Sequence, residues 1–473
     1  MNLNQHPLFS RRSALKSISS GFGYLAFAAM AHEQARAEKK ILTTSNPLAP
    51  KAPHFPARAK RVIFLAMRGA PSHVDLFDYK PKLQSDDGKA GKFGRIRSGK
   101  LMGSPWEFKQ HGKSGQWISE LMPELAAHAD DLCLLKGMHT DLPNHPQAQT
   151  QMHTGSFQFV RPSLGAWSLY GLGTENADLP GFVALNPPNG SAQHYGSAFL
   201  PAAYQAARFG GVQPRRGGRR GSRDPRDHIP NIANPNLSKE QQRLQLDFVQ
   251  QLNRAKLQRE GEHQGVEGVI ESFELAFRMQ DALPELMDLN AEKQETLELY
   301  GIDGSETDRF GRQCLLARKF AEEGVRFIEL SHGNWDHHRN LSNDLPARCG
   351  EIDKPIAGLL ADLKRRNMLD DTLVVWAGEF GRTPHGQGGD GRDHNNKGYT
   401  TWMAGGGVKG GFSYGATDEY GYEAVEGKMH IHDWHATILH LLGLDHEKLT
   451  FNHAGRPFRL TDVHGEVARE ILA

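Results

Sequence analysis

The chain has 473 residues, of which 38% are hydrophobic and 23% are charged, and its formal net charge is +1 at pH 7. Residues 1–37 hold four of the 56 Lys and Arg and one of the 55 Asp and Glu, which leaves 52 basic and 54 acidic residues and a net charge of −2 beyond them. This balance gives no reason to expect nucleic acid or a membrane surface as a partner. The length suits one large α/β domain with insertions, or two domains.

The N-terminal segment has the three parts of a twin-arginine (Tat) signal. Arg11 and Arg12 stand before a weakly apolar run over residues 18–30, and Ala35 and Ala37 offer a small-residue cleavage site. The run is shorter than the ~20 residues that a membrane-spanning helix needs, and no later stretch is long and apolar enough. We therefore expect a signal over residues 1–37, passage through the Tat translocase, and a soluble periplasmic or otherwise exported protein.

The next elements begin with a linker over residues 38–60, which hold four prolines and show no periodicity. Residues 61–67 form a short apolar run, typical of a strand buried on both faces in a parallel sheet. Residues 85–117 predict loops and edge structure, and residues 121–135 a helix followed by a strand. Residues 209–227 are rich in Arg and Gly, so we expect a flexible surface insertion there, whose arginines would also attract sulfate or phosphate.

The C-terminal half alternates helices with strands. We expect helical structure over 238–299, 309–324, 353–368 and 433–442, strands over 325–330 and 372–377, and a long Gly-rich stretch over 386–411. This alternation predicts an α/β fold over residues 61–473, with a mostly parallel central sheet and helices on both of its faces.

Cysteine is scarce and histidine is common. Cys133, Cys314 and Cys349 are widely spaced and allow one disulfide at most, not a disulfide framework. Twelve of the 24 histidines follow Ser331. Their distribution directs attention to the ends of the predicted strands, because ligands in open α/β sheets bind beyond the carboxyl ends of the strands.

Two polar clusters follow the first predicted strands. His73 and Asp75 can both face a metal if their loop is extended, although a turn that caps nearby backbone explains them equally well. Asn144 and His145 stand where a helix is expected to begin near Pro146, and such an end attracts phosphate or sulfate. The alternative is a capped helix start with a surface histidine.

Two further clusters follow the later strands. Asp336 and His338 lie in a segment with three histidines, and imidazole and carboxylate ligands suit Zn²⁺, Mn²⁺ or another transition ion. Glu379, Arg382 and His394 follow the strand over 372–377. There Glu379 can ligate a metal, Arg382 can clamp an oxyanion and His394 can complete the coordination. A solvated Gly-rich loop with incidental charges is the alternative for this last group.

Histidines 430, 432, 435 and 440 form a group that we interpret as structural. Asp433 is a good N-cap for the last helix, and His440 lies on the surface of that helix.

Two segments resemble the superfamily of alkaline phosphatases, sulfatases and phosphoglycerate mutases. Residues 353–381 lead from a helix through a strand to Glu379, and residues 433–443 resemble a second helical motif of that superfamily. Asp336 and His338 would take the place of an upstream metal-binding pair, and His394 that of the final histidine ligand. The resemblance implies an alkaline phosphatase-like three-layer sandwich.

More closely, residues 55–473 resemble a large bacterial family of Tat-exported, sulfatase-like proteins of unassigned function. Residues 72–75, 77–81, 379–384 and 460–465 match its pattern. The chain departs from the superfamily at three places: Arg68-Gly69 stands where a metal-binding Asp is usual, His145 where a Ser, Thr or Cys nucleophile is usual, and Phe380 where a ligand is usual. The chain has no Cys-x-Pro-x-Arg signature.

These features predict an exported hydrolase of phosphate or sulfate esters that uses a divalent metal ion: zinc, manganese or calcium. Asp336, His338, Glu379 and His394 would hold the metal. His145 would act as general base or nucleophile beside Asn144, and Arg382 would stabilise the ester oxygens. His73 and Asp75 are further candidate ligands.

Two other functions stay open. One is a non-catalytic, metal-containing protein that binds sulfated or phosphorylated glycans. The other is an assembly protein whose histidines are structural. The expected partner is an anionic small-molecule or glycan ester.

Overall fold

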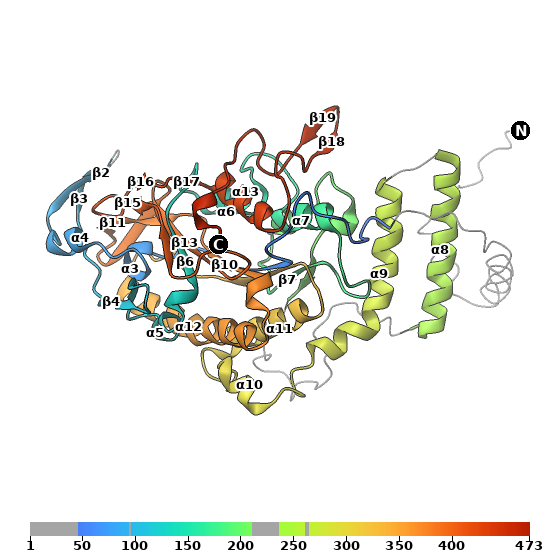
Figure 1. The fold of residues 1–473 in the computed structure, drawn as a ribbon, viewed down its shortest axis with the longest axis horizontal. Coiled ribbons are helices and arrows are strands. Elements are labelled where there is room, and N and C mark those ends of the chain that lie inside the picture. The colour runs from blue at the N-terminus through green and yellow to red at the C-terminus, as the bar shows by residue number, and fades with distance from the viewer. Residues whose placement is uncertain (1–45, 94–95, 211–235, 261–263) are drawn as a thin grey trace, which may run out of the picture.

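The computed structural model describes residues 46–93, 96–210, 236–260 and 264–473 (Figure 1). The expected Tat signal, residues 38–45 of the expected linker and residues 211–227 of the Arg/Gly-rich segment lie outside the described residues. Among the described helices, none combines the length and apolar composition needed to cross a bilayer. All three cysteines are buried and free.

A large mixed sheet forms the centre of the molecule, with the strand order β14-β6-β13-β10-β1-β9-β7-β8 and β17 paired to β6. Its strands are β1 (Arg61–Met67), β6 (Leu132–His139), β7 (Phe182–Leu185), β8 (Ala207–Phe209), β9 (Phe327–His332), β10 (Thr372–Ala377), β13 (Tyr399–Ala404), β14 (Phe412–Tyr414) and β17 (Met429–His430). β1 is parallel to both β9 and β10, and among the described strands of this sheet only β13 runs antiparallel to its neighbours. The expected α/β fold with a mostly parallel sheet is therefore confirmed.

The sheet is the middle of three layers, and β1 shows how the sequence produces them. Its side chains alternate between faces. Ile63 and Leu65 join a buried cluster with α11 (Asp308–Glu322) and α12 (Leu341–Arg365). Val62 and Phe64 join a second cluster with α7 (Leu164–Leu172) and α13 (Ile431–Leu441). Figure 1 shows these helix pairs on opposite sides of the sheet. A strand that is apolar at every position thus supplies both cores.

The helices are α3 (His73–Leu76), α4 (Pro81–Ser85), α5 (Pro123–Ala126), α6 (His145–Thr154), α7 (Leu164–Leu172), α8 (Lys239–Glu260), α9 (Gln264–Met287), α10 (Gln294–Leu299), α11 (Asp308–Glu322), α12 (Leu341–Arg365) and α13 (Ile431–Leu441). The small strands outside the central sheet are β2 (Ala90–Phe93), β3 (Ile96–Lys100), β4 (Phe108–His111), β5 (Gln116–Ser119), β11 (Gly381–Gln387), β12 (Gly391–Asn395), β15 (Ala416–Thr417), β16 (Ala424–Glu426), β18 (Phe451–His453) and β19 (Arg456–Phe458).

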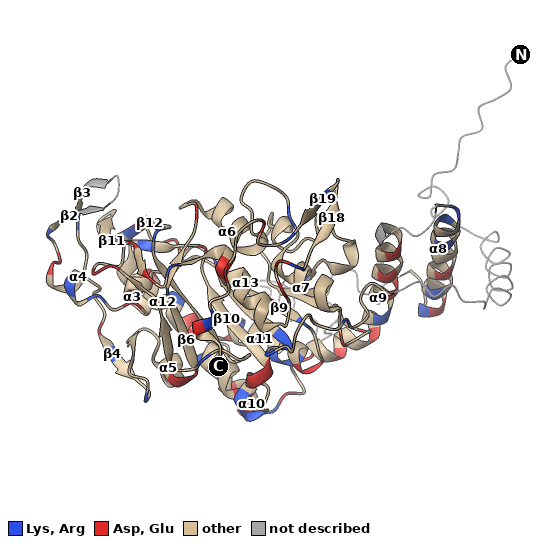
Figure 2. Cartoon of the chain, turned by 45° about the horizontal axis from the view of Figure 1, so that its top comes forward, with Lys and Arg blue, Asp and Glu red and all other residues tan. Residues whose placement is uncertain are grey.

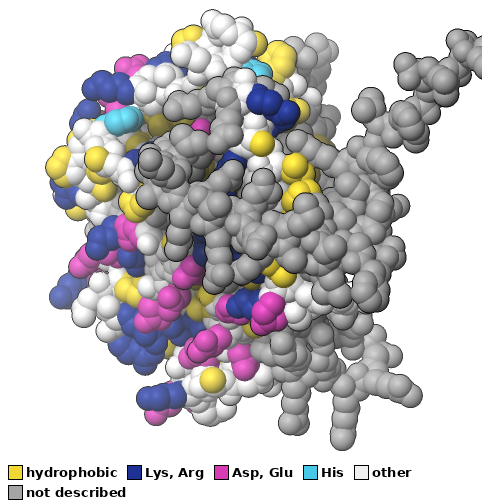
Figure 3. Space-filling view, turned by 90° about the vertical axis from the view of Figure 1, so that its right-hand side faces the viewer, with side chains coloured by type: hydrophobic (Ala, Val, Ile, Leu, Met, Phe, Trp, Pro, Cys, Tyr) yellow, Lys and Arg dark blue, Asp and Glu magenta, His cyan; other side chains and the backbone are white. Residues whose placement is uncertain are grey.

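Helices α8 and α9 lie side by side at one end of the molecule (Figure 1). Arg243 of α8 pairs with Glu274 of α9 at 2.7 Å, and Gln250 donates to the Ile270 carbonyl. Acidic and basic residues are mixed along both helices (Figure 2), and the described part of this end shows the same mixture on its surface (Figure 3). The helical pattern expected over residues 238–299 corresponds to α8, α9 and α10.

Candidate metal centre

Four side chains from three separate segments converge at the carboxyl ends of the central strands. His145 begins α6, Asp336 and His338 lie in the loop after β9, and His394 lies on β12. One ligand atom from each lies within 4.8 Å of the others. Asp336 Oδ1 lies 3.1 Å from His145 Nε2, 2.9 Å from His338 Nε2 and 3.3 Å from His394 Nε2. Four ligands about 2 Å from one tetrahedral ion are roughly 3.3 Å apart, so this spacing fits a metal.

The outer nitrogens of all three histidines face oxygen acceptors. His145 Nδ1 lies 2.6 Å from Glu379 Oε1, His394 Nδ1 lies 2.8 Å from the Pro143 carbonyl, and His338 Nδ1 is bonded to Gln387 Oε1. An oxygen acceptor at Nδ1 places the hydrogen there and leaves the Nε2 lone pair directed into the group. Metal-binding histidines are held in this way in general.

Nε2 of His145 is the most informative atom of the group. It is buried and, among the described residues, has no well-directed hydrogen-bond partner, although Asp336 is near. Buried polar atoms without partners are rare, and a metal ion would satisfy this one. The residues present therefore fit a metal ion. On the solvent side the group stays open, because the Asp336 side chain is 42% exposed and that of His338 is 34% exposed.

The charges of the group are strongly coupled. Burial alone would lower the pKa of His145, but the carboxylates of Asp336 and Glu379 beside its ring raise that pKa to about 9. Burial alone would raise the pKa of Asp336, but the adjacent side chains of His145, His394 and Arg382 hold that pKa well below its usual range. Without a metal, a proton on His145 thus balances the carboxylates.

Glu379, expected from the sequence as a ligand, lies behind the group. Its buried carboxylate accepts hydrogen bonds from the Gly69 backbone at 2.9 Å and from Gln149 Nε2 at 2.9 Å, in addition to its contact with His145. Burial alone would raise the pKa of Glu379, but the hydrogen bonds from His145 and Gln149 and the charge of His145 together have the larger effect, so the pKa lies below its usual value. The structure thus places Glu379 where it holds the His145 ring.

Arg382, expected as an oxyanion clamp, is buried with its donors directed at the protein. Its guanidinium donates to the carbonyls of Gly69, Ala70 and Arg392, and Nη2 lies 2.7 Å from Asp336 Oδ1. Arg382 therefore fixes the position of the Asp336 carboxylate.

His73 and Asp75 lie outside the four-residue group. His73 Nε2 lies 2.8 Å from the Gly421 carbonyl. Asp75 is fully buried and forms a two-point ion pair with Arg392, at 2.6 and 2.9 Å. Because Arg392 precedes His394 on β12, this pair supports the strand that carries His394.

The two expected helix starts differ in outcome. α6 begins at His145 with exposed Asn144 as its N-cap, close to the expected start at Pro146. At α13 the N-cap is His430 rather than Asp433, because the Asp433 carboxylate accepts the His430 backbone N–H in a capping box. His432 Nε2 contacts the Gly155 carbonyl and His435 Nε2 contacts the Met152 carbonyl, and neither histidine belongs to the four-residue group.

Gln149, Gln387 and the Pro143 carbonyl contribute to the site without having been expected. Gln149 follows His145 by four residues on α6, which places both on one helix face and is a signal the sequence contains. For Gln387 and Pro143 the sequence contains no comparable signal.

The family model described as "Protein of unknown function (DUF1501)" matches residues 59–472. The chain belongs to this family. No curated protein matches this DUF1501 chain by sequence.

Among solved structures, the lipoteichoic acid synthase LtaP from Listeria monocytogenes is 9% identical, with a TM-score of 0.40 over 87% of this chain and 78% of that one. The PsFucS1 sulfatase from Pseudoalteromonas sp. is 13% identical, with a TM-score of 0.35 over 90% and 73%. The C-terminal periplasmic domain of EcEptC from Escherichia coli, in complex with Zn, is 9% identical, with a TM-score of 0.36 over 87% and 96%. At these values, the chemistry of the DUF1501 chain has to be judged from its own side chains.

Proposed function

We propose that the chain is an exported, metal-dependent hydrolase of phosphate or sulfate esters. The observation that supports it is the convergence of three histidine Nε2 atoms and one aspartate oxygen, with each Nδ1 held by an oxygen acceptor. The superfamily motifs over residues 353–381 and 433–443 support the choice of phosphate and sulfate esters among metal-dependent hydrolyses.

The donor set narrows the choice of metal. Three imidazoles and a carboxylate suit Zn²⁺, Mn²⁺ or a similar ion, whereas Ca²⁺ prefers six to eight oxygen ligands. Calcium is therefore the least favoured of the ions that the sequence left open. When bound, a divalent transition ion would polarise the ester and activate water.

The protein's own groups have distinct roles in this proposal. His145, Asp336, His338 and His394 hold the metal. Both ring nitrogens of His145 are committed, Nδ1 to Glu379 and Nε2 to the group, so we assign His145 as a ligand rather than as the general base or nucleophile. Hydrolysis then needs no covalent intermediate on the protein.

The anionic ester would approach from the open side of the group. Asn144 directly precedes His145, is exposed and caps α6, and a helix N-terminus favours negative charge. Asn144 is thus proposed to contact the ester oxygens. Arg382 acts indirectly, by holding the Asp336 carboxylate.

The same proposal includes export by the Tat translocase and a periplasmic location, on the basis of residues 1–37. The test is fusion of these residues to a reporter that is active only after Tat export. Export should stop when Arg11 and Arg12 are both replaced by Lys. A reporter that is exported equally well with both lysines would contradict this part.

The central test is elemental analysis of protein purified without chelators. We expect about one transition-metal ion per chain, and its loss in Asp336→Ala. Asp178→Ala, which changes an exposed carboxylate far along the chain, is the matched control. The metal-loaded protein is then assayed with p-nitrophenyl phosphate and p-nitrophenyl sulfate.

Two results would overturn the proposal. If Asp336→Ala and Glu379→Ala leave metal content and turnover unchanged, the site has been misassigned. If metal is bound but no ester is hydrolysed while sulfated glycans bind, the chain is a binding protein instead.

A further inference from the structure

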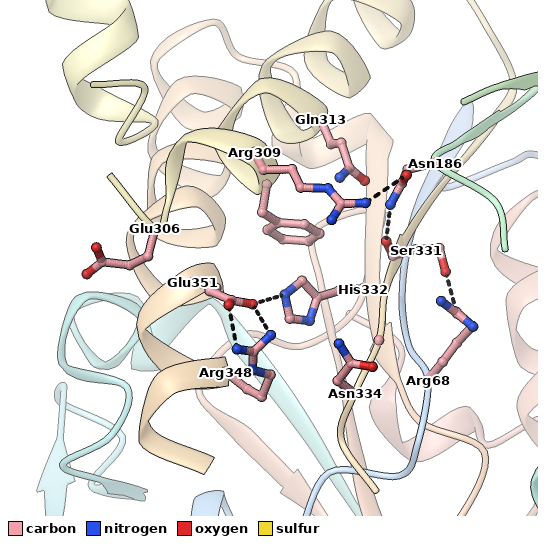
Figure 4. Close-up of a pocket in the computed structure, with 12 residues that line it drawn as sticks. Arg68, Asn186, Glu306, Arg309, Gln313, Ser331, His332, Asn334, Arg348 and Glu351 are labelled. Carbon is pink, nitrogen blue, oxygen red and sulfur yellow. Dashed lines mark hydrogen bonds and ion pairs between the residues drawn. The ribbon is translucent and has the colours of Figure 1, made fainter. Parts of the chain in front are cut away.

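A second polar site lies next to the metal centre in the chain and in the fold. A cavity of about 200 Å³ is lined by residues from the ends of β1, β7 and β9 together with residues of α11 and α12 (Figure 4). Gly333 and Asn334 form part of its wall, and Asp336 follows them in the same loop. The Arg68 backbone joins this loop on both sides, donating to the His332 carbonyl at 2.8 Å and accepting from Trp335 at 3.3 Å.

In one half of the cavity the polar side chains hydrogen-bond to one another. His332 Nε2 lies 2.8 Å from Glu351, and its Nδ1 accepts from the Trp335 indole at 3.0 Å. Burial lowers the pKa of His332, which favours its neutral form. Arg348 donates twice to the same Glu351, at 2.7 and 2.8 Å. These side chains compensate one another and leave no net charge on this wall.

The other half includes some polar groups for which the described residues supply no partner. Arg68 donates from Nε to Ser331 Oγ at 2.7 Å, and no contact with an acid is found for its guanidinium among the described residues. Gln313 is 2% exposed and lines the cavity, yet its Oε1 has no hydrogen-bond partner among the described residues. A buried carbonyl oxygen of this kind requires a donor from water or from a ligand. Figure 4 shows the Glu306 carboxylate directed away from the other labelled side chains, so it does not neutralise Arg68.

We propose that this cavity binds one acidic sugar unit, with its carboxylate or sulfate on Arg68 and a ring hydroxyl donating to Gln313. A planar guanidinium with free N–H groups suits an oxyanion. The Asn334 amide and the hydroxyl hydrogen of Ser331 suit neighbouring hydroxyls, whereas the Asn186 amide is already bonded to Arg309 and to the Ser331 carbonyl. The volume lies below the ~300–1,000 Å³ of pockets for drug-sized ligands, which fits a single ring.

The shared loop gives the cavity a role in the reaction. A glycan with its acidic unit in the cavity would present a neighbouring unit to the metal centre. This role as a substrate subsite rests on the proposed function, whereas binding of the sugar acid does not. The experiment therefore measures binding separately from turnover.

The test is titration calorimetry of the full chain with galacturonate, galactose 6-sulfate, galactose and inorganic sulfate. The same titrations with Asp336→Asn, whose metal centre is impaired, separate the cavity from the metal. We expect both acidic sugars to bind in both proteins, and galactose to bind at least about tenfold more weakly. The tighter of the two acidic sugars identifies the acidic group.

Arg68→Gln should weaken binding of both acidic sugars at least about tenfold, because a charge-assisted contact is lost. Arg254→Gln, an exposed arginine of α8, is the matched control and should bind as the unchanged chain does. Gln313→Leu should weaken the acidic sugars and leave inorganic sulfate unaffected. It also tests the proposal if Arg68→Gln does not fold.

Three results would overturn the proposal. The first is equal binding of galactose and the acidic sugars. The second is unchanged binding in both Arg68→Gln and Gln313→Leu. The third is binding of inorganic sulfate alone, which would make the cavity a simple anion site. If the acidic sugars bind but no ester is hydrolysed, the cavity proposal stands and the proposed hydrolase fails.

Discussion

Glu379 lies behind His145, with its Oε1 2.6 Å from the ring nitrogen that faces away from the metal-binding group. A carboxylate in this position fixes the ring, keeps the hydrogen on Nδ1 and makes Nε2 a better electron donor. The side chain is buried and has further partners in Gly69 and Gln149, so it has little freedom to turn toward a metal itself.

Replacement of Glu379 should therefore weaken metal binding without removing a side chain that contacts the metal. Glu379→Gln keeps an acceptor for Nδ1 and loses the charge, and we expect metal affinity to fall about 10–100-fold. The measurement is competition with a chelator of known Zn²⁺ affinity. Glu351→Gln is the matched control, because Glu351 also pairs with a histidine, His332, outside the group. Equal effects of the two substitutions would contradict the role of Glu379.

The raised pKa of His145 predicts how metal binding depends on pH. The metal displaces the proton that His145 holds up to pH about 9, so metal affinity should rise by about tenfold per pH unit between about pH 6.5 and 9. Chelator competition at several pH values measures this. His145→Gln should bind the metal weakly, and its metal affinity should depend less steeply on pH. If the steep dependence persists in this variant, the proton belongs to another group.

The same pKa predicts a change in the stability of the metal-free protein. The folded pKa of about 9 lies above the unfolded value, so the stabilisation is complete below about pH 6.5 and is lost as the pH rises through 9. The free energy of unfolding of the metal-free chain should thus fall over this window. His145→Gln should show a smaller fall, and urea denaturation at pH 6 and pH 9 is the measurement. A stability that rises with pH only in the unchanged chain would reverse the assignment.

The sequence predicted the elements whose pattern is local. The apolar run over residues 61–67 is β1 without any shift of boundary, because a strand buried on both faces needs no partner to be recognised. The helix expected from residue 353 is α12, which begins at Leu341. The sequence predicted a later start because proline usually breaks a helix, but α12 continues through Pro346 and Pro355. β13 was missed because it lies in a Gly-rich stretch that reads as a loop.

Some residues of the candidate site could also be proposed from the sequence alone. Asp336, His338 and His394 follow or adjoin strand ends. Open α/β sheets bind small molecules and ions at these ends, so side chains of this type in this position suggest a metal site. The roles of Glu379 and Arg382 depend on contacts across the fold: 234 residues separate His145 from Glu379. Residue type and spacing cannot distinguish a carboxylate that binds a metal from one that supports a histidine. Asp75 illustrates the opposite case, because a buried arginine takes up the carboxylate that looked available.

The buried pair of Asp75 and Arg392 should matter for stability more than for chemistry. Asp75→Ala would leave Arg392 charged and fully buried without its partner, and loss of one partner of such a pair costs about 3–5 kcal/mol. Urea denaturation measures this. Lys448→Ala, which breaks the exposed pair with Asp445, is the control and should change the midpoint little. A small effect of Asp75→Ala would mean that water reaches Arg392.

Gly69 should be required for the position of Asp336. Its φ of +107° lies in a region that other residues rarely adopt, and a Cβ there would lie 2.8 Å from the backbone nitrogens of Trp335 and Asp336. Gly69→Ala should thus push the loop that carries Asp336 away from the histidines and lower metal content. Gly88→Ala separates the effect of the positive φ from the effect of the close contact with the loop. Gly88 also has a positive φ, of +74°, but a Cβ added there would meet no other group within 4 Å. Both variants should lose some stability, and only Gly69→Ala should lose metal. Equal metal content in both variants would show that the close approach of Gly69 to the loop does not position Asp336.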